Sequence, residues 1–206
     1  MKFFAFLLLL TFIGCASKSP VTQTDNYLAQ GEFYLKESDF SRARFYYSVA
    51  LEKGQGDKAK NLAKLGAVSI LLNQYDEALN YLKLSNEAQK SDDVDYNLAL
   101  CFVYLNQPAK AYEILRSLYE KNSDDYEVLK LIIMTKMQTK EFQESFDLFE
   151  KLPPKIRKES DLQPYYVYTL IMLDRIKEAD FQMINVKNID VAKKIMTILK
   201  PKLANK

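Results

Sequence analysis

The sequence predicts an all-α protein in which about five helical hairpins stack into a solenoid, followed by a C-terminal capping helix. Two observations favour this fold class. First, five glycines and six prolines in 206 residues leave few turn signals, which argues against a many-stranded β fold. Second, a pattern of an aromatic residue, an alanine and an apolar stripe recurs along the chain. A hydrophobic content of 48% is sufficient for a packed core.

The N-terminal residues have the pattern of a secretion signal. Lys2 is followed by an uncharged apolar run from Phe3 to Ile13, which is shorter than the roughly 20 residues that span a bilayer. A short apolar run after a positive charge is typical of a signal-peptide core and not of a transmembrane helix. We therefore expect residues 1–14 to be removed as a signal peptide.

Cys15 follows directly after this run, between Gly14 and the small residues Ala16 and Ser17. Here the sequence resembles a bacterial lipobox, the signal at which a cysteine is diacylated and becomes the mature N-terminus. Two acyl chains give stable membrane anchoring, and residues 15–24 would form the lipidated cysteine and a polar tether. Because Ala16 is not the aspartate that retains such lipoproteins at the inner membrane, the resemblance implies an outer-membrane location facing the periplasm. The alternative is an ordinary cleaved signal with an incidental cysteine.

The hairpin pattern is defined by five aligned small residues. The stretches "SDFSRARFYYSVAL" and "NQYDEALNYLKLS" both read as an aromatic residue, two further residues, an alanine and an apolar stripe. Extending the alignment along the chain places Ala43, Ala78, Ala111, Ser145 and Ala179 at intervals of 35, 33, 34 and 34 residues. Ser-Asp pairs recur in phase with this period, and such residues cap the unpaired N–H groups at helix starts.

This period resembles the tetratricopeptide repeat, a 34-residue pair of antiparallel helices. The resemblance implies a right-handed superhelix over residues 25–188, with approximate repeats at 24–57, 59–92, 92–125, 126–159 and 160–188. Gly31, Gly66 and Ala99 take the small position that lets the second helix of a repeat approach the first closely. Ile133 replaces the small residue in the fourth repeat, where the match is weaker.

Residues 189–206 are expected to form the capping helix. One apolar face at helical spacing consists of Ala192, Ile195, Met196, Leu199 and Leu203, widened by Val191 and Ile198. Such a helix would cover the exposed core of the last hairpin, as the end repeats of a solenoid require. The alternative is a basic helix that lies on a membrane surface. Pro201 is predicted to kink or end the helix.

The composition argues against catalysis and against nucleic-acid binding. The chain has no histidine, and Cys101 lies between apolar residues in "LALCFVYL", so we interpret it as a buried small hydrophobe and not as a nucleophile. We expect no enzyme activity, no cofactor, no metal site and no small-molecule substrate. Lys and Arg number 29 against 27 Asp and Glu, which is not the basic excess of a nucleic-acid-binding surface.

A concave face lined by the first helices is the expected binding site, because the repeat family uses this face. The groove-lining residues implied by the resemblance are Tyr96, Leu100, Tyr104, Lys130, Met134, Tyr168 and Met172. An aromatic and methionine-rich groove favours a peptide or helix of another protein. Only Lys130 fits the family's clamp for C-terminal carboxylates. Alternatively, these side chains pack internally, or the C-terminal helix occupies the groove.

Together these patterns predict a membrane-anchored protein-interaction scaffold that holds or assembles a cell-envelope complex. Pilotins and the lipoprotein subunit of the β-barrel assembly machine share this plan, and the repeat pattern does not select between them. The alternative function is a periplasmic peptide-binding or chaperone module for exported clients. The partner and the oligomeric state stay open.

Overall fold

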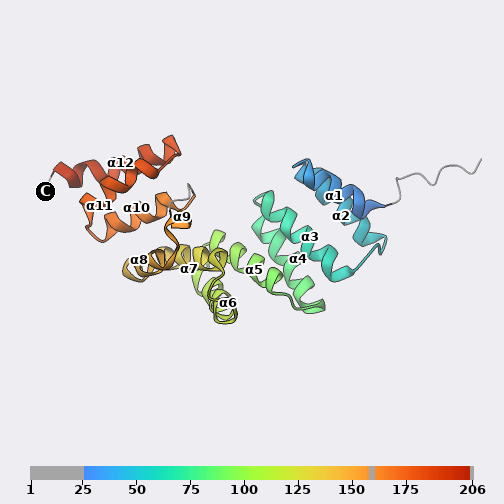
Figure 1. The fold of residues 1–206 in the computed structure, drawn as a ribbon. Helices are drawn as coiled ribbons and strands as arrows, with labels where there is room; N and C mark the ends of the chain where they lie inside the picture. The colour runs from blue at the N-terminus through green and yellow to red at the C-terminus, as the bar shows by residue number, and fades with distance from the viewer. Residues whose placement is uncertain (1–25, 158–160, 205–206) are drawn as a thin grey trace, which may run out of the picture.

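The computed structural model describes residues 26–157 and 161–204, and these residues form helices joined by short turns (Figure 1). The predicted signal peptide, Cys15 and the tether lie outside the described residues. Within the described ranges there is no β-strand, so the predicted all-α class is confirmed.

Five helical hairpins follow one another along the chain. The first two are α1 (Tyr27–Lys36) with α2 (Phe40–Glu52), and α3 (Lys58–Leu71) with α4 (Tyr75–Ala88). The next two are α5 (Asp92–Tyr104) with α6 (Pro108–Lys121), and α7 (Tyr126–Gln138) with α8 (Phe142–Lys151). The one-turn helix α9 (Pro154–Arg157) precedes the fifth hairpin, α10 (Gln163–Met172) with α11 (Ile176–Gln182). A 3-10 helix, η2 (Met183–Asn185), leads into α12 (Ile189–Ala204), which packs on α10 and α11.

The hairpins are arranged as an arc (Figure 1). Helices α1 and α2 lie at one end, α12 lies at the other, and α5 to α8 form the middle. Each helix from α1 to α8 packs against the next, α8 packs against α10, and α5 also contacts α3 and α7. The order of contacts is therefore that of a solenoid, in which each unit packs mainly on its neighbours.

Glycine permits the closest helix approaches in the first two hairpins. A Cβ atom added to Gly31 would lie 2.5 Å from Cε1 of Tyr47, and one added to Gly66 would lie 2.5 Å from Cγ of Leu82. Both Tyr47 and Leu82 are fully buried. The five aligned small residues are also fully buried: Ala43, Ala78, Ala111, Ser145 and Ala179. Small and large positions therefore interlock as the repeat pattern requires.

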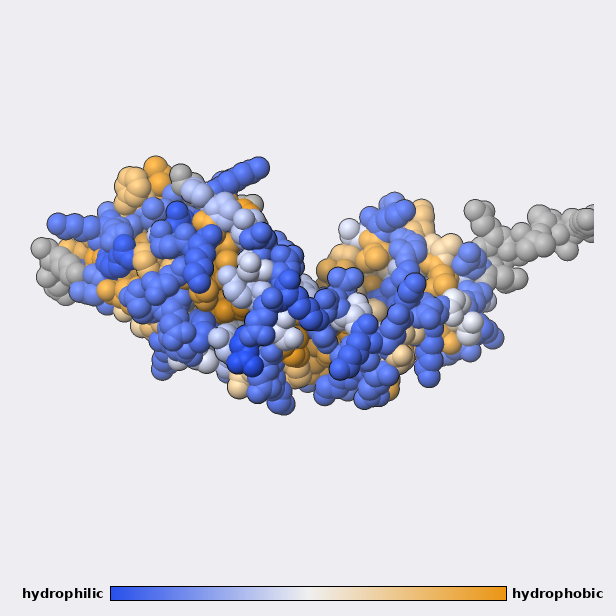
Figure 2. Space-filling view, turned by 60° about the horizontal axis from the view of Figure 1, so that its bottom comes forward, coloured by the Kyte–Doolittle hydropathy of each residue, from blue (hydrophilic) through white to orange (hydrophobic). Residues whose placement is uncertain are grey.

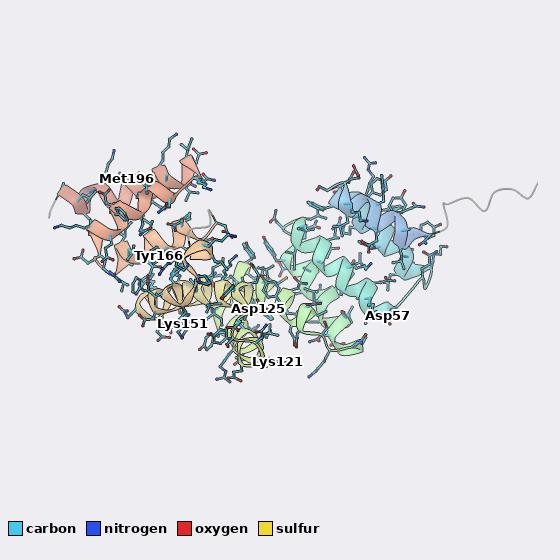
Figure 3. All side chains as sticks on the ribbon, viewed as in Figure 1. Asp57, Lys121, Asp125, Lys151, Tyr166 and Met196 are labelled. Carbon is cyan, nitrogen blue, oxygen red and sulfur yellow. The ribbon has the colours of Figure 1, made fainter. Side chains whose placement is uncertain are left out.

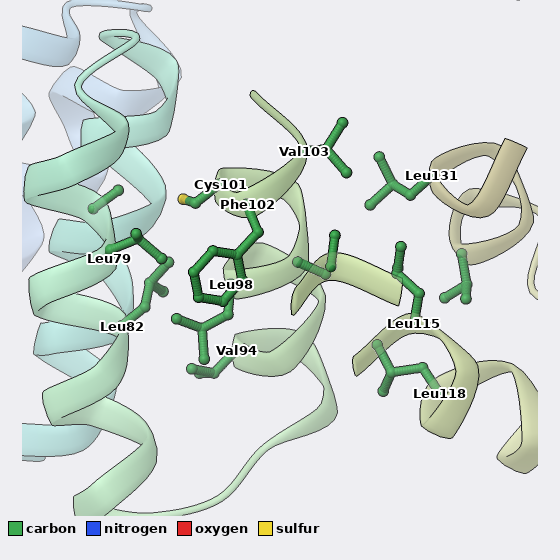
Figure 4. Close-up of a cluster of buried hydrophobic side chains, with 14 of the residues drawn as sticks. Leu79, Leu82, Val94, Leu98, Cys101, Phe102, Val103, Leu115, Leu118 and Leu131 are labelled. Carbon is green, nitrogen blue, oxygen red and sulfur yellow. The ribbon is translucent and has the colours of Figure 1, made fainter. Parts of the chain in front are cut away.

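The central core lies where α4, α5 and α6 meet. Leu82, Leu98, Phe102 and Leu115 belong to one cluster of buried side chains (Figure 4), and Cys101 is fully buried in the same cluster. The predicted interpretation of Cys101 as a buried hydrophobe agrees with this position. The cluster also includes Leu131 of α7, so it joins three hairpins. The stacking of repeats, and not any single hairpin, therefore buries this apolar surface.

Each hairpin turn contains one residue in the left-handed helical conformation. These residues are Ser38, Asn73, Asn106, Lys140 and Asp174, with φ between 55° and 64°. In each turn the next backbone N–H returns to the carbonyl five residues before it, as in the bond from Gln107 N–H to Phe102 O at 2.8 Å. This is the Schellman motif, which satisfies carbonyl groups at the end of the first helix.

Helix α12 places most of its predicted apolar face inward. Ile195 and Leu199 are buried, and Met196 is partly buried against the same cluster. Ile198 is 41% exposed, so it does not extend the buried face as expected. Pro201 does not end the helix, which continues to Ala204. Proline in the last turn removes one backbone hydrogen bond, and the remaining residues keep their helical contacts.

Candidate protein-binding groove

The molecule is hollowed between its two halves (Figure 2). Helices α5 and α7 lie in the middle of the arc (Figure 1), and α5 contacts both α3 and α7. The hollow opens between the N-terminal hairpins and the part formed by α10 to α12. This is the concave face on which the groove-lining residues were predicted.

On α5, the most exposed of the three predicted residues is the one nearest the C-terminal end of the helix. Tyr96 and Leu100 are partly buried and pack against the central core. Tyr104 is 52% exposed, and its ring stacks on that of Tyr75 with centroids 4.7 Å apart and an interplanar angle of 6°. Two flat aromatic faces at this distance form an offset stack, which holds the Tyr104 ring in a defined orientation.

On α7, the predicted residues are largely engaged within the protein. Lys130 Nζ donates a hydrogen bond to Glu127 Oε1 at 2.9 Å, and the lysine side chain is only 13% exposed. Met134 is partly buried against the central core. Because Glu127 neutralises Lys130, the groove does not present this lysine as an isolated positive charge for a carboxylate.

On α10, the predicted Tyr168 makes an internal contact, while Met172 is 43% exposed. The Tyr168 ring packs edge-to-face on Phe142 of α8, with centroids 6.2 Å apart. Tyr165, which was not predicted, is 37% exposed. Burial raises the pKa of Tyr165, and the electrostatic influence of Tyr104 on α5 and of Asp161 raises it further.

The exposed part of the concave face is therefore a patch that we call the aromatic groove. Its exposed residues are Tyr104, Tyr165 and Met172, the partly buried Tyr75 supports the Tyr104 ring, and Tyr96 lies at its buried end. Tyr165 lies seven residues before Met172, which is two turns of the same helix face. That spacing is the sequence signal that would have identified Tyr165.

Beside Tyr96 lies an acidic hollow of about 350 Å³. Its lining residues come from the starts of α5 and α7 and the end of α6, and include Asp92, Asp93, Asp125 and Glu127. Lys121 pairs with Asp92 at 2.5 Å. Burial, together with the charges of Glu127 and Asp125, raises the pKa of Tyr96 to about 12. Negative charge therefore gathers at this end of the aromatic groove.

Neither a metal cluster nor a membrane-spanning helix is found in the described part of the chain. Residues 26–157 and 161–204 contain no group of three His, Cys, Asp or Glu placed to hold a metal ion. In the same ranges, the helices are too short or too polar to cross a bilayer. Burial raises the pKa of the Cys101 thiol to about 12, so this cysteine stays protonated near neutral pH.

Comparisons with known proteins identify the fold. No protein-family model matches the sequence, and no curated protein matches it. Solved structures do match. YrrB, described as a TPR protein with an unusual peptide-binding site, is 21% identical with a TM-score of 0.62, over 86% of this chain and 90% of that chain. A tetratricopeptide repeat protein from Parabacteroides merdae is 15% identical with a TM-score of 0.71, over 91% of this chain and 78% of that chain.

MamA from Desulfovibrio magneticus is a further match. It is 13% identical with a TM-score of 0.66, over 85% of this chain and 94% of that chain. These identities establish a shared fold and not a shared partner. The chain has the fold of the tetratricopeptide repeat proteins.

Proposed function

We propose that this chain is a protein-interaction scaffold whose aromatic groove binds a segment of another polypeptide. The observation that carries the proposal is the stacked Tyr75–Tyr104 pair, whose outer ring is 52% exposed on the concave face. Tyrosine rings supply large contact area at low conformational-entropy cost. Exposed aromatic surface on a rigid concave support favours a polypeptide ligand.

The charges around the groove favour an apolar segment that carries lysine or arginine. Asp93 and Asp125 lie at the Tyr96 end of the groove, where Glu127 is already paired with Lys130. A cationic side chain would gain from these carboxylates and from the adjacent aromatic rings. An acidic tail would meet repulsion there. YrrB is described as having a peptide-binding site, and the shared fold supports a peptide ligand here.

We further propose that Cys15 anchors this scaffold in the bacterial outer membrane, facing the periplasm, where it holds or helps assemble an envelope complex. The support is the lipobox-like sequence around Cys15. Cys15→Ala removes the site of the two acyl chains that provide stable anchoring. We expect this variant to move from the membrane fraction to the soluble fraction. Retention of the variant in the membrane would contradict the anchoring proposal.

Co-purification from native membranes tests the groove. The wild-type chain should retain a stoichiometric partner, and Tyr104→Ala with Tyr165→Ala should lose it. The control changes two aromatic residues on the first hairpin, Phe33 and Phe45, to alanine, because they are 56% and 59% exposed. Loss of the partner in both variants, or in neither, would contradict binding through the groove. Capture of many unrelated peptides by the groove would instead favour a chaperone.

A further inference from the structure

The C-terminal end of the solenoid exposes bulky apolar side chains. Ile184 is 84% exposed, Phe181 is 74% exposed and Ile189 is 70% exposed. These are the three largest exposed fractions among the exposed large hydrophobic residues of the described chain. They lie within one short stretch, from the end of α11 through η2 to the start of α12. We call this surface, together with the outer flank of α12, the C-terminal tip.

Positive charge is concentrated on the same stretch. Residues 183–204 contain five lysines and one acidic residue, Asp190, although the whole chain is nearly balanced. Lys193 Nζ lies 3.8 Å from the Asp190 carboxylate, and both side chains are largely exposed. An ion pair of this kind is weak. Most of the positive charge at the C-terminal tip is therefore not neutralised by carboxylates among the described residues.

Lysines and apolar side chains share one stripe of α12. Ile189, Lys193, Met196 and Lys200 follow a spacing of four, three and four residues, which places them on one helix flank. They line a hollow of about 540 Å³ together with Val186 and Ala192, among others. Lys193 and Lys200 are two turns apart, so they stand about 10 Å apart along the helix axis with Met196 between them. The hollow therefore has an apolar floor and a cationic rim.

We propose that the C-terminal tip binds the surface of a bilayer that contains anionic phospholipid. The lysine ammonium groups would contact lipid phosphates, while the exposed isoleucines and Phe181 enter the interface between headgroups and acyl chains. Lysine suits this arrangement because its apolar stem lies along hydrophobic surface while its charge stays in water.

The position of the tip favours a bilayer over a second copy of the chain. Helix α12, which carries Met196, forms one end of the arc (Figure 3), where a flat surface has access that the concave face does not offer. A two-fold contact between two tips would place the same lysine-rich surfaces against each other. Like charges at close range oppose such a dimer. This proposal depends neither on the aromatic groove nor on acylation of Cys15.

Vesicle flotation tests the proposal on the chain from Ala16 to Lys206, which keeps every described residue and lacks the acylation site. We expect binding to phosphatidylcholine vesicles that contain phosphatidylglycerol, and weak binding to pure phosphatidylcholine. A lysine near an anionic surface contributes about fivefold to binding, so Lys193→Ala with Lys200→Ala should lower the partition coefficient about 30-fold. The matched control is Lys83→Ala with Lys90→Ala, which removes two exposed lysines elsewhere.

A second variant tests the apolar part of the tip. Ile184→Ser with Ile189→Ser should also weaken vesicle binding, and circular dichroism should show unchanged helicity because both residues are mostly exposed. Equal binding to both vesicle types, or equal losses in the tip and control lysine variants, would overturn the proposal. Sedimentation velocity without lipid provides the remaining test. A dimer that the isoleucine variant dissociates would show that a second copy, and not a bilayer, covers the tip.

Discussion

The contact between Gly66 and Leu82 should control how closely α3 approaches α4. Gly66→Ala would place a methyl carbon 2.5 Å from Leu82 Cγ and 2.6 Å from Cδ2. Non-bonded carbon atoms normally lie about 3.5–4.0 Å apart, so the neighbours must separate by roughly 1 Å. Leu82 is fully buried and cannot turn into solvent. The substitution therefore overpacks the hairpin.

Two opposing contributions determine how Gly66→Ala changes the free energy of unfolding. Overpacking a well-packed core costs about 1–3 kcal/mol, while alanine is about 1 kcal/mol more favourable than glycine within a helix. The single variant is therefore a weak test, and a double-mutant cycle is a sharper one. Leu82→Ala alone should cost about 2–5 kcal/mol. In the double variant the added methyl occupies vacated space, so the coupling energy should be about 1–3 kcal/mol.

Denaturant unfolding followed by circular dichroism measures this coupling, because the chain has no tryptophan. A constant dependence of the unfolding free energy on denaturant would show that only stability changed. Asn80→Ala, at an exposed position of α4, reports the helix-propensity gain without a clash. If the effects of Gly66→Ala and Leu82→Ala add within about 0.5 kcal/mol, the close contact inferred here is wrong.

Three further predictions concern the core and the turns. Ala78→Glu should destabilise the chain by several kcal/mol, because it buries an unpaired charge at a fully buried position, and an unchanged melting temperature would contradict the repeat alignment. Lys140→Gly should raise the unfolding free energy by about 1 kcal/mol, since Lys140 has a φ of 64°, and a loss of stability would refute left-handed strain there. The pKa of the Cys101 thiol is about 8.5 in the unfolded chain and about 12 in the folded chain, because burial disfavours the thiolate. The contribution of Cys101 to the free energy of unfolding is therefore fully present below about pH 8.5 and declines as the pH rises to about 12. The stability difference between wild type and Cys101→Ala should shrink over that range, and a constant difference would exclude this linkage.

The repeat period was predictable because it is a packing requirement. Each hairpin needs a small residue early in its second helix, and all five aligned positions are fully buried. The same intervals of 35, 33, 34 and 34 residues separate the left-handed turn residues. The left-handed conformation of these turn residues was not predicted, because glycine is the residue that usually indicates it. None of the five turn residues is a glycine, and the returning hydrogen bonds of the Schellman motif hold them in this conformation.

The groove was harder to predict because exposure depends on contacts between repeats. Tyr104 and Met172 are exposed. Lys130, by contrast, pairs with Glu127 one turn away. Tyr168 packs on Phe142, which belongs to the preceding hairpin. Helical spacing identifies a shared face, but it does not determine which residue of that face meets a neighbouring helix.

The junction between the fourth and fifth hairpins explains why Tyr165 faces the groove. Ile133 replaces a small residue, and it is buried in a cluster with Phe149 and Tyr166. The Tyr166 ring packs edge-to-face on Phe149 with centroids 5.1 Å apart, and its hydroxyl donates to Glu150 Oε1 at 2.8 Å. These contacts set the rotation of α10 about its axis.

The adjacent Tyr165 is about 100° around the helix from Tyr166, because an α-helix has about 3.6 residues per turn. Because Tyr166 is held against α8, Tyr165 lies on a different side of α10, where it is 37% exposed and where Tyr104 of α5 influences it electrostatically. A large residue at the small position therefore does not disrupt the solenoid. It joins a junction built from aromatic contacts and one hydrogen bond, and that junction positions part of the aromatic groove.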